Sequence, residues 1–322
     1  MTMRFRRLGR TALKVSELCL GTMNFGPRTS EAESHAILDR AIDLGINFID
    51  TANQYGGECG VGATETILGN WLAREPARRD KIVLATKVHE PMSDDVNDRG
   101  LCARHIMMAC EASLRRLRVD HIDLYQFHHI DRMAPMDEIW QAVDRLVAQG
   151  KIIYAGSSNF PGWKIAQACE TARAGHRLGP VCEQSLYNLI ERRVELEVIP
   201  ACAEYGLGLL AWSPLAGGLL AGSGKDGARR RAASVSQARA DRHDQLQRFE
   251  ALCADLGEAP SAVALAWTLH QPGVTSAIIG PRTIGQLTAV AHVPGLALAP
   301  DVLAQLDGIF PPCGPAPEAY AW

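Results

Sequence analysis

The sequence predicts a protein of the α/β class: a single (β/α)8 TIM barrel with an N-terminal β-hairpin and long loops at its C-terminal face. Short apolar, β-rich runs alternate with segments of helical spacing almost from end to end. Eight such strands are expected, each followed by a helix. That number closes a barrel, whereas an open doubly wound sheet would need fewer strands. No repeat or linker divides the chain, so residues 1–322 are expected to form one domain.

The first segment, 1–16, is expected to be a small hairpin that plugs the bottom of the barrel. Its residues alternate in polarity around a Gly9-Arg10-Thr11 turn, which is typical of two short antiparallel strands. The barrel strands are expected at 18–21, 47–50, 82–87, 122–128, 152–158, 181–184, 208–212 and 276–279.

A capping box predicts where the first helix begins. Ser30 and Glu33 are spaced so that each side chain can satisfy the backbone N–H of the other. The apolar residues Ile37, Leu38 and Ala41 then follow at helical spacing. Further helices are expected at 65–74, 104–117, 135–149, 161–174, 194–205 and 261–270.

Two segments show no periodic pattern. Segment 222–243, after the seventh strand, contains five arginines and almost no large apolar residue, so we expect a long surface loop. It is either a solvated connection or a lid whose cations face an anionic ligand. The proline-rich tail, 311–322, either folds over the mouth of the pocket, docks elsewhere or contacts another subunit.

Composition excludes several classes of protein. A net charge of −3 and a pI near 6.4 argue against a dedicated binder of nucleic acid or of anionic membranes, because phosphate affinity needs a basic excess. No apolar run approaches the roughly 18 residues of a membrane span, and the charged N-terminus does not resemble a signal peptide. The nine cysteines include no Cys-x-x-Cys pair, which indicates buried thiols in a reducing cytoplasm.

Polar side chains end most of the predicted strands, where the chemistry of such barrels is located. Burying an ammonium at the end of an apolar run costs several kcal/mol unless the group is paired, so Lys87 in particular points to a site. Each of these residues taken alone also has a structural explanation, and the functional interpretation depends on the whole ring. The ring consists of Asp50, Tyr55, Lys87, His128, Asn159, Gln184 and Trp212.

A metal-dependent hydrolase built on His128, His129 and Asp131 is a weaker alternative. Consecutive residues of a strand point to opposite faces, so the two histidines are not expected to converge on one ion. No metal site is therefore predicted.

Several short motifs occur in an order that is typical of one enzyme family. They are Leu-Gly-Arg-Thr (8–11), Asp-Thr-Ala-Asn-Gln-Tyr-Gly (50–56), Ala-Thr-Lys (85–87), Asp-Leu-Tyr-Gln-Phe-His (123–128), Gly-Ser-Ser-Asn-Phe (156–160), Ala-Trp-Ser-Pro-Leu (211–215) and Ile-Ile-Gly-Pro-Arg-Thr (278–283). Together they resemble the aldo-keto reductase family, from the first residues to about residue 310. The resemblance implies the same (β/α)8 barrel and the reduction of a small carbonyl substrate.

The family's catalytic tetrad corresponds to Asp50, Tyr55, Lys87 and His128. By this resemblance Tyr55 is the general acid. A free tyrosine titrates near ~10, and the Lys87 ammonium would favour its phenolate, while Asp50 pairs with Lys87. His128 would donate a hydrogen bond to the substrate oxygen and orient it against the nicotinamide.

The resemblance also implies NADPH as the hydride donor, with NADH as an alternative. The one Gly-x-Gly-x-x-Gly match, at 222–227, falls inside the expected surface loop rather than at a turn from a strand directly into a helix, which argues against the Rossmann route to a dinucleotide. Arg282 suits the 2′-phosphate, whereas Ala289-Val290 replace the Glu-Asn pair that often holds the adenine in the family. The implied cofactor contacts are Gly21, Thr22, Ser158, Asn159, Gln184, Trp212, Ser213, Leu215, Gly217, Gly280, Arg282 and Gln286.

A second function remains open at this point. A chain of this fold can also be a cofactor-binding regulatory or redox-sensing subunit with slow turnover. The intact tetrad argues against a protein without activity. The substrate and the oligomeric state are not readable from the sequence.

Overall fold

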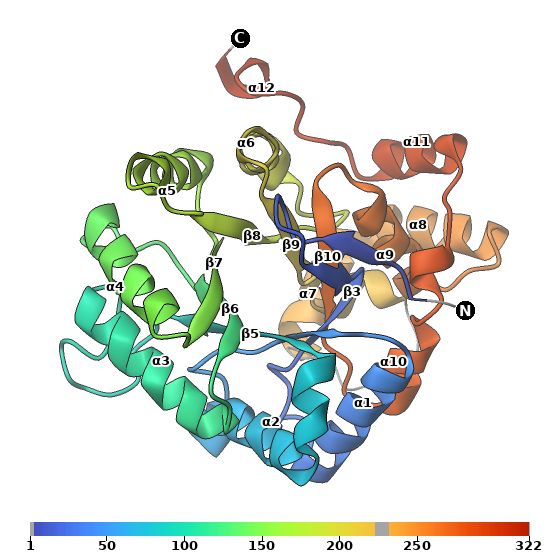
Figure 1. Ribbon diagram of the computed structural model, residues 1–322. Coiled ribbons are helices and arrows are strands. Elements are labelled where there is room, and N and C mark those ends of the chain that lie inside the picture. Colours follow the sequence, from blue (N-terminus) through green and yellow to red (C-terminus); the bar gives the residue numbers. More distant parts are fainter. Residues whose placement is uncertain (1–2, 223–231, 322) are drawn as a thin grey trace.

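The computed structural model describes residues 3–222 and 232–321, and in this part of the chain eight parallel strands close into a barrel (Figure 1). Each strand pairs with the next one along the chain, and the last pairs with the first. The predicted (β/α)8 barrel is thus confirmed. Its strands are β3 (Leu18–Gly21), β4 (Phe48–Asp50), β5 (Val83–Val88), β6 (Ile122–Phe127), β7 (Ile152–Ser158), β8 (Pro180–Leu186), β9 (Gly208–Trp212) and β10 (Val274–Ile279).

Helices follow the strands and form a ring around the barrel (Figure 1). Each expected helix is present, with bounds within a few residues of the prediction. The segment 194–205 begins as a short 3-10 turn, η3 (Arg193–Glu195), and becomes α-helical only at Val198. The ring consists of α1 (Glu31–Asp43), α2 (Ala63–Arg74), α3 (Ala103–Leu117), α4 (Met136–Ala148), α5 (Gly162–Ala174), α6 (Val198–Tyr205), α9 (Pro260–His270), α10 (Ile284–Ala289) and α11 (Pro300–Ile309).

The capping box at the start of α1 forms as predicted. The Ser30 hydroxyl accepts a hydrogen bond from the Glu33 backbone N–H at 3.3 Å, and the Glu33 carboxylate accepts one from the Ser30 N–H at 3.1 Å. Ile37, Leu38 and Ala41 are buried about two and three turns into the helix. The cap therefore fixes where α1 begins, and the apolar spacing fixes which face it turns to the barrel.

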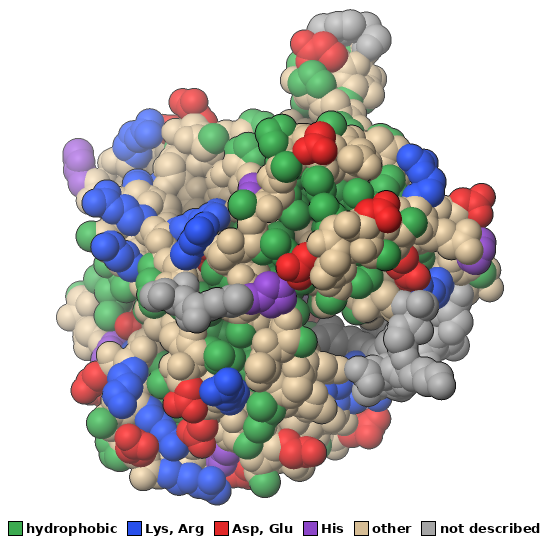
Figure 2. Space-filling view, turned by 90° about the vertical axis from the view of Figure 1, so that its right-hand side faces the viewer, with side chains coloured by type: hydrophobic (Ala, Val, Ile, Leu, Met, Phe, Trp, Pro, Cys, Tyr) green, Lys and Arg blue, Asp and Glu red, His purple; other side chains and the backbone are tan. Residues whose placement is uncertain are grey.

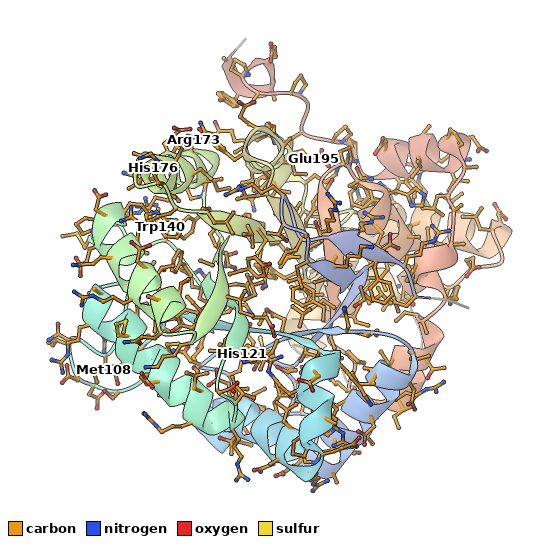
Figure 3. All side chains as sticks on the ribbon, in the orientation of Figure 1. Met108, His121, Trp140, Arg173, His176 and Glu195 are labelled. Atoms are coloured by element: carbon orange, nitrogen blue, oxygen red, sulfur yellow. The ribbon has the colours of Figure 1, made fainter. Side chains whose placement is uncertain are left out.

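Two apolar layers hold the barrel together. The larger layer lies between the strands and the helices. In it, the indole N–H of Trp140 on α4 donates to the Ala168 carbonyl on α5 at 3.1 Å (Figure 3). The smaller layer fills the barrel interior and includes Phe48 and Leu210 from the strands. An interior packed in this way leaves the ends of the strands as the place for a site.

The N-terminal hairpin forms from β1 (Phe5–Arg7) and β2 (Lys14–Ser16), which pair antiparallel. The Arg6 guanidinium donates to the carbonyl of Val274, the first residue of β10, at 2.5 Å. Leu8 and Val15 pack into the interior layer of the barrel. The hairpin therefore covers the N-terminal end of the barrel, as predicted.

The prediction of a loop at 222–243 is wrong from residue 232 onward. Helix α7 (Ala232–Asp241) and helix α8 (His243–Asp255) occupy this stretch, and residues 223–231 lie outside the described residues. Alanine-rich sequence favours a helix without a long apolar stripe, and Ala238 packs against the outer core. The Arg239 guanidinium pairs with Glu250 of α8, so this arginine holds two helices together rather than facing a ligand.

The C-terminal tail carries a short helix, α12 (Glu318–Ala321), which stands out from the rounded body of the molecule (Figures 1 and 2). Its Tyr320 hydroxyl lies 3.4 Å from the Glu197 carboxylate, at the start of α6. The described tail residues do not line the pocket, so the option in which the tail folds over the pocket mouth is wrong. None of the helices in the described residues is both long and apolar enough to cross a membrane.

Candidate active site

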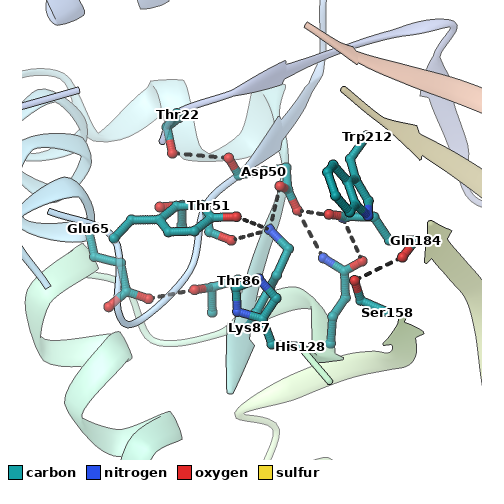
Figure 4. A network of polar contacts seen from close by, with 12 residues as sticks. Thr22, Asp50, Thr51, Glu65, Thr86, Lys87, His128, Ser158, Gln184 and Trp212 are labelled. Atoms are coloured by element: carbon teal, nitrogen blue, oxygen red, sulfur yellow. Dashed lines mark hydrogen bonds and ion pairs between the residues drawn. The ribbon is translucent and has the colours of Figure 1, made fainter. Parts of the chain in front are cut away.

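The predicted polar residues lie at one end of the barrel. Asp50 ends β4, Trp212 ends β9, and Lys87 is next to last in β5. His128 and Asn159 directly follow β6 and β7. Because the strands run parallel, their C-terminal ends meet at the same rim. Figure 4 shows Asp50, Lys87 and His128 converging there.

Lys87 is fully buried, and three oxygens satisfy its ammonium. Its Nζ lies 2.5 Å from Asp50 Oδ2, 2.8 Å from the Thr51 carbonyl oxygen and 3.4 Å from the Tyr55 hydroxyl. Burial alone would lower the pKa of Lys87, but Asp50 and Tyr55 outweigh it and the pKa is raised. The lysine therefore stays charged, and the charge pairing expected from the sequence is present.

Tyr55 lies in the loop after β4 and lines the wall of a pocket. Its ring meets the His128 ring edge-on, with 5.8 Å between centroids and 75° between planes. The Lys87 Nζ is 5.0 Å from the centre of the tyrosine ring. The phenol, the ammonium and the imidazole thus form one contiguous group, although three different βα units supply them.

The second carboxylate oxygen of Asp50 is held by two amides. Gln126 Nε2 donates to Asp50 Oδ1 at 2.9 Å, and Gln184 Nε2 donates to the same oxygen at 3.0 Å. Gln184 Nε2 also donates to Gln126 Oε1 at 3.0 Å. Gln184, expected to contact the cofactor, thus directs both N–H groups at protein atoms, and its carbonyl oxygen remains for a ligand.

Gln126 was not predicted as a site residue. It lies inside β6, and the sequence pattern does not show which side of that strand faces the barrel interior.

His128 is 8% exposed and lies against the charged group. Burial, followed by the Lys87 ammonium, lowers the pKa of His128 to about 2. Its Nδ1 has no hydrogen-bond partner among the described residues. At neutral pH the imidazole is therefore uncharged, with one N–H to donate.

The two consecutive histidines do not diverge, and the expectation that they would is wrong. The rings of His128 and His129 are stacked, with centroids 4.9 Å apart and planes 11° apart. Strand β6 ends at Phe127, so the alternation of side chains no longer applies to them. Asp131, the third residue of that alternative, instead accepts hydrogen bonds from the backbone N–H groups of its own neighbourhood.

A pocket of about 780 Å³ opens beside Tyr55 and His128, within the range of small-molecule and cofactor sites. Thr22, whose hydroxyl donates to the Asp50 carbonyl at 3.0 Å, forms part of its wall. All twelve predicted cofactor contacts line this one pocket: Gly21, Thr22, Ser158, Asn159, Gln184, Trp212, Ser213, Leu215, Gly217, Gly280, Arg282 and Gln286.

Asn159 and Trp212 form one hydrogen-bonded wall of the pocket. Trp212 Nε1 donates to Asn159 Oδ1 at 3.1 Å, while Asn159 Nδ2 donates to the His128 carbonyl at 3.0 Å and to Ser158 Oγ at 3.1 Å. These contacts fix the plane of the indole, which suits a residue that stacks on a flat ring.

The far end of the pocket is built by the segment after β10. Gln286 Oε1 accepts the Arg282 backbone N–H at 2.9 Å, and the Thr283 hydroxyl accepts the Gln286 N–H at 3.2 Å. Asn24 Nδ2 donates to the Gly280 carbonyl at 2.8 Å and so joins this segment to the loop after β3. The position of Arg282 on the pocket wall is compatible with a phosphate ligand.

Glu183 is a buried carboxyl beside the pocket that the sequence analysis missed. It accepts hydrogen bonds from Ser157 Oγ at 2.5 Å, Ser185 Oγ at 2.8 Å and the Phe160 N–H at 3.1 Å. Burial raises the pKa of Glu183 to about 7 despite these bonds. The residue holds the turn at Asn159, whose φ of 58° lies in the left-handed region. A carboxylate inside a predicted barrel strand was the signal for it.

Comparison with known proteins agrees with this geometry. Residues 17–310 match the model of the Aldo/keto reductase family. The chain is 50% identical over 326 residues to the uncharacterized oxidoreductase YrpG of Bacillus subtilis (strain 168), covering 99% of this chain and all of that protein. It is 31% and 32% identical, over 334 residues, to probable voltage-gated potassium channel beta subunits of Oryza sativa subsp. japonica and Arabidopsis thaliana. Each alignment covers 99% of this chain and the whole relative.

Three lines of evidence coincide: the closed barrel, the charged group at its C-terminal rim and a family match over nearly the whole length. The chain belongs to the aldo/keto reductase family and is an NAD(P)H-dependent oxidoreductase.

Proposed function

We propose that the enzyme reduces aldehydes or ketones to alcohols with NADPH, and that Tyr55 is the general acid. One observation carries the proposal. The Lys87 ammonium lies 2.5 Å from the Asp50 carboxylate and 3.4 Å from the Tyr55 hydroxyl, at the wall of a pocket large enough for a cofactor. A buried cation held against a phenol is an arrangement suited to proton donation.

Bound NADPH supplies the hydride that reaches the carbonyl carbon. Tyr55 then gives its proton to the oxygen that becomes the alcohol, and the Lys87 ammonium stabilises the negative charge left on the phenol. The uncharged His128 donates a hydrogen bond to the same oxygen and orients it. Asp50 keeps Lys87 charged and in place.

The Tyr55→Phe variant tests this assignment. Removing the hydroxyl removes the proton donor while the pocket keeps its shape, so kcat is expected to fall by roughly 10²–10⁴-fold with cofactor binding retained. Turnover of an aromatic aldehyde is followed by NADPH absorbance, and binding by fluorescence titration. Tyr320→Phe, on the projecting tail, is the matched control. Substantial turnover in Tyr55→Phe would show that another group is the acid.

Arg282 is proposed to select NADPH over NADH. Its guanidinium suits the charge and geometry of the 2′-phosphate, which NADH lacks. Arg282→Ala is therefore expected to raise the KM for NADPH about 10-fold or more, with little change for NADH. Steady-state kinetics with both cofactors measures this. An equal rise for the two would remove the 2′-phosphate assignment.

A second candidate function follows from two of the relatives, which are probable channel beta subunits and match over their full length. In that case the chain is a cofactor-binding regulatory or redox-sensing subunit with slow turnover. Stopped-flow mixing with NADPH and an aldehyde separates the two functions. Continued turnover supports the reductase, and oxidation that stops at one equivalent per site supports the sensor.

The thiols suggest where the protein works. All nine cysteines are free, and six of them are buried. Burial raises the pKa of thiols such as Cys110, to about 12, and so suppresses their reactivity. This usage suits a reducing cytoplasm, which we propose as the location.

A further inference from the structure

Glu90, His128 and His129 bring a carboxylate and two imidazoles together at the edge of the pocket. One ligand atom from each lies within 4.8 Å of the other two. In residues 3–222 and 232–321, no other group of three His, Cys, Asp or Glu side chains converges in this way. The proton transfer proposed above uses His128 but neither of the other two.

The ends of two neighbouring strands bring these residues together. Val88 and Phe127 are paired as the last residues of β5 and β6, and Glu90 and His129 lie in the loops that directly follow, two residues beyond each. Glu90 Oε1 lies 3.2 Å from His129 Nε2, and the His129 ring is stacked on that of His128. The three side chains therefore meet just beyond the C-terminal ends of two paired strands.

The cluster of Glu90, His128 and His129 is partly exposed to solvent, and one of its nitrogens lacks a hydrogen-bond partner among the described residues. The Glu90 and His129 side chains are 25% and 42% exposed, and both histidines line the pocket. His128 Nδ1 is buried without a hydrogen-bond partner in the described part of the chain. A small ion can reach the group from the pocket and would find imidazole nitrogen there.

We propose that Glu90, His128 and His129 form a binding site for a divalent cation of the zinc class, and that the bound ion competes with the carbonyl substrate. Two histidines and a glutamate make up a known set of zinc ligands that leaves a fourth position open. Zinc bonds of about 2.0–2.2 Å in a tetrahedron place ligand atoms roughly 3.4 Å apart. The Glu90–His129 pair already has a spacing of 3.2 Å, and the ligand atoms of all three residues lie within 4.8 Å, so closing on an ion requires the partly exposed Glu90 and His129 side chains to turn toward the buried His128.

Competition follows from the position of His128, and this part rests on the proposed function. The His128 ring meets the Tyr55 ring edge-on at the pocket wall, so an ion held there occupies the space that the carbonyl oxygen needs beside Tyr55. Zinc is therefore expected to raise the apparent KM for the aldehyde and to leave kcat at saturating aldehyde unchanged. Chelation with EDTA restores the original KM.

Calorimetric titration of ZnCl₂ into the cofactor-free protein tests the site without any turnover. One ion per chain is expected, and Glu90→Gln should weaken binding at least tenfold. The matched control is Glu258→Gln, because Glu258 lies 3.1 Å from His292 Nε2 in a similar pair outside the pocket lining. His129→Asn provides a second variant and should also lose the ion. Unchanged zinc affinity in both Glu90→Gln and His129→Asn would overturn the site.

Inhibition kinetics test the competition. Glu90→Gln should keep the turnover of the wild type and need at least tenfold more zinc for the same rise in KM. Inhibition that saturating aldehyde does not relieve would overturn the competition. A protein that binds zinc through Glu90 but reduces no carbonyl compound would support the site and remove the proposed function, so the two failures are distinguishable.

Discussion

At the scale of single residues, the site is a set of buried polar groups that satisfy one another. Lys87 would be costly to bury alone, and three oxygens hold its ammonium. Asp50 in turn uses one carboxylate oxygen for Lys87 and the other for the amides of Gln126 and Gln184. The charge pair is thereby fixed in orientation, which a proton transfer to a positioned substrate requires.

The lowered pKa of His128 predicts a pH dependence of stability. An unfolded histidine titrates near 6.5, whereas His128 in the folded protein titrates near 2, so between these values the unfolded state binds more protons. The free energy of unfolding should therefore fall as the pH drops below about 6.5. From pH 6.5 to 5 we expect a loss of about 2 kcal/mol from this residue.

Urea denaturation of wild type and His128→Asn at pH 7 and pH 5 measures the effect. The variant should lose less stability between the two pH values than the wild type does. His176→Asn, at the exposed end of α5 (Figure 3), is the control and should behave as the wild type. Identical losses in all three proteins would contradict a His128 that is held neutral.

The sequence identified residues at the ends of predicted strands but not Gln126, which lies in the middle of one. Asp50, Lys87, His128 and Trp212 were predicted because each closes an apolar run. Gln126 was missed because a polar residue inside a strand indicates a site only when its side chain faces the barrel interior. The sequence pattern did not show which side that is.

At the scale of elements, the βα units pack on one another through contacts that a sequence pattern does not contain. Gly69 on α2 shows this, because a Cβ placed on it would collide with the backbone carbonyl of Arg116 on α3. The two helices meet with backbone against backbone at this point. Glycine is needed there for close approach, although it weakens the helix itself.

Gly69→Ala is therefore expected to destabilise the protein although alanine is the better helix former. Overpacking should lower the free energy of unfolding by roughly 1–3 kcal/mol. Gly308→Ala, in α11, is the matched control, since nothing lies within 4 Å of the position its Cβ would take. That substitution should be neutral or stabilise by up to about 1 kcal/mol. Urea denaturation measures the free energy of unfolding of both variants. A Gly69→Ala variant as stable as the wild type would contradict the packing argument.

The prediction of helices and strands succeeded where apolar residues recur with a clear period. It failed in the alanine-rich segment, which lacks such a period. The eight strands and the capped helix α1 follow directly from apolar spacing. Helix α7 has almost no apolar stripe, so the segment 222–243 resembled a solvated loop. Its helical structure depends on backbone propensity and on contact with neighbouring elements, which spacing alone does not encode.

At the scale of the whole molecule, Arg192 joins the end of the chain to the barrel. Its guanidinium donates to the Asp307 carboxylate at 2.6 Å, to the Phe310 carbonyl at 2.8 Å and to the Glu195 carboxylate at 2.7 Å. It also lies 5.0 Å from the centre of the Trp267 ring. One side chain thus connects the loop after β8 with α9 and α11.

Arg192→Ala is expected to lower the free energy of unfolding by roughly 2–4 kcal/mol, because it leaves a buried carbonyl and a carboxylate without a partner. The neighbouring Arg193→Ala is the control, since that side chain is 76% exposed and its ion pair within the described residues is the surface pair with Glu191. It should change stability little. Equal effects of the two substitutions in thermal or urea denaturation would refute the role of Arg192.

The pairing of β3 with β10 has a consequence for how the protein is made. Leu18 lies opposite Ala277, so the first strand of the barrel bonds to the last one across most of the chain. A nascent polypeptide on the ribosome must therefore hold seven strands with two open edges until translation has passed residue 279. Assembly is thus completed late, and chaperones that shield exposed strand edges should bind ribosome-held chains that end before β10 more strongly than chains that include it.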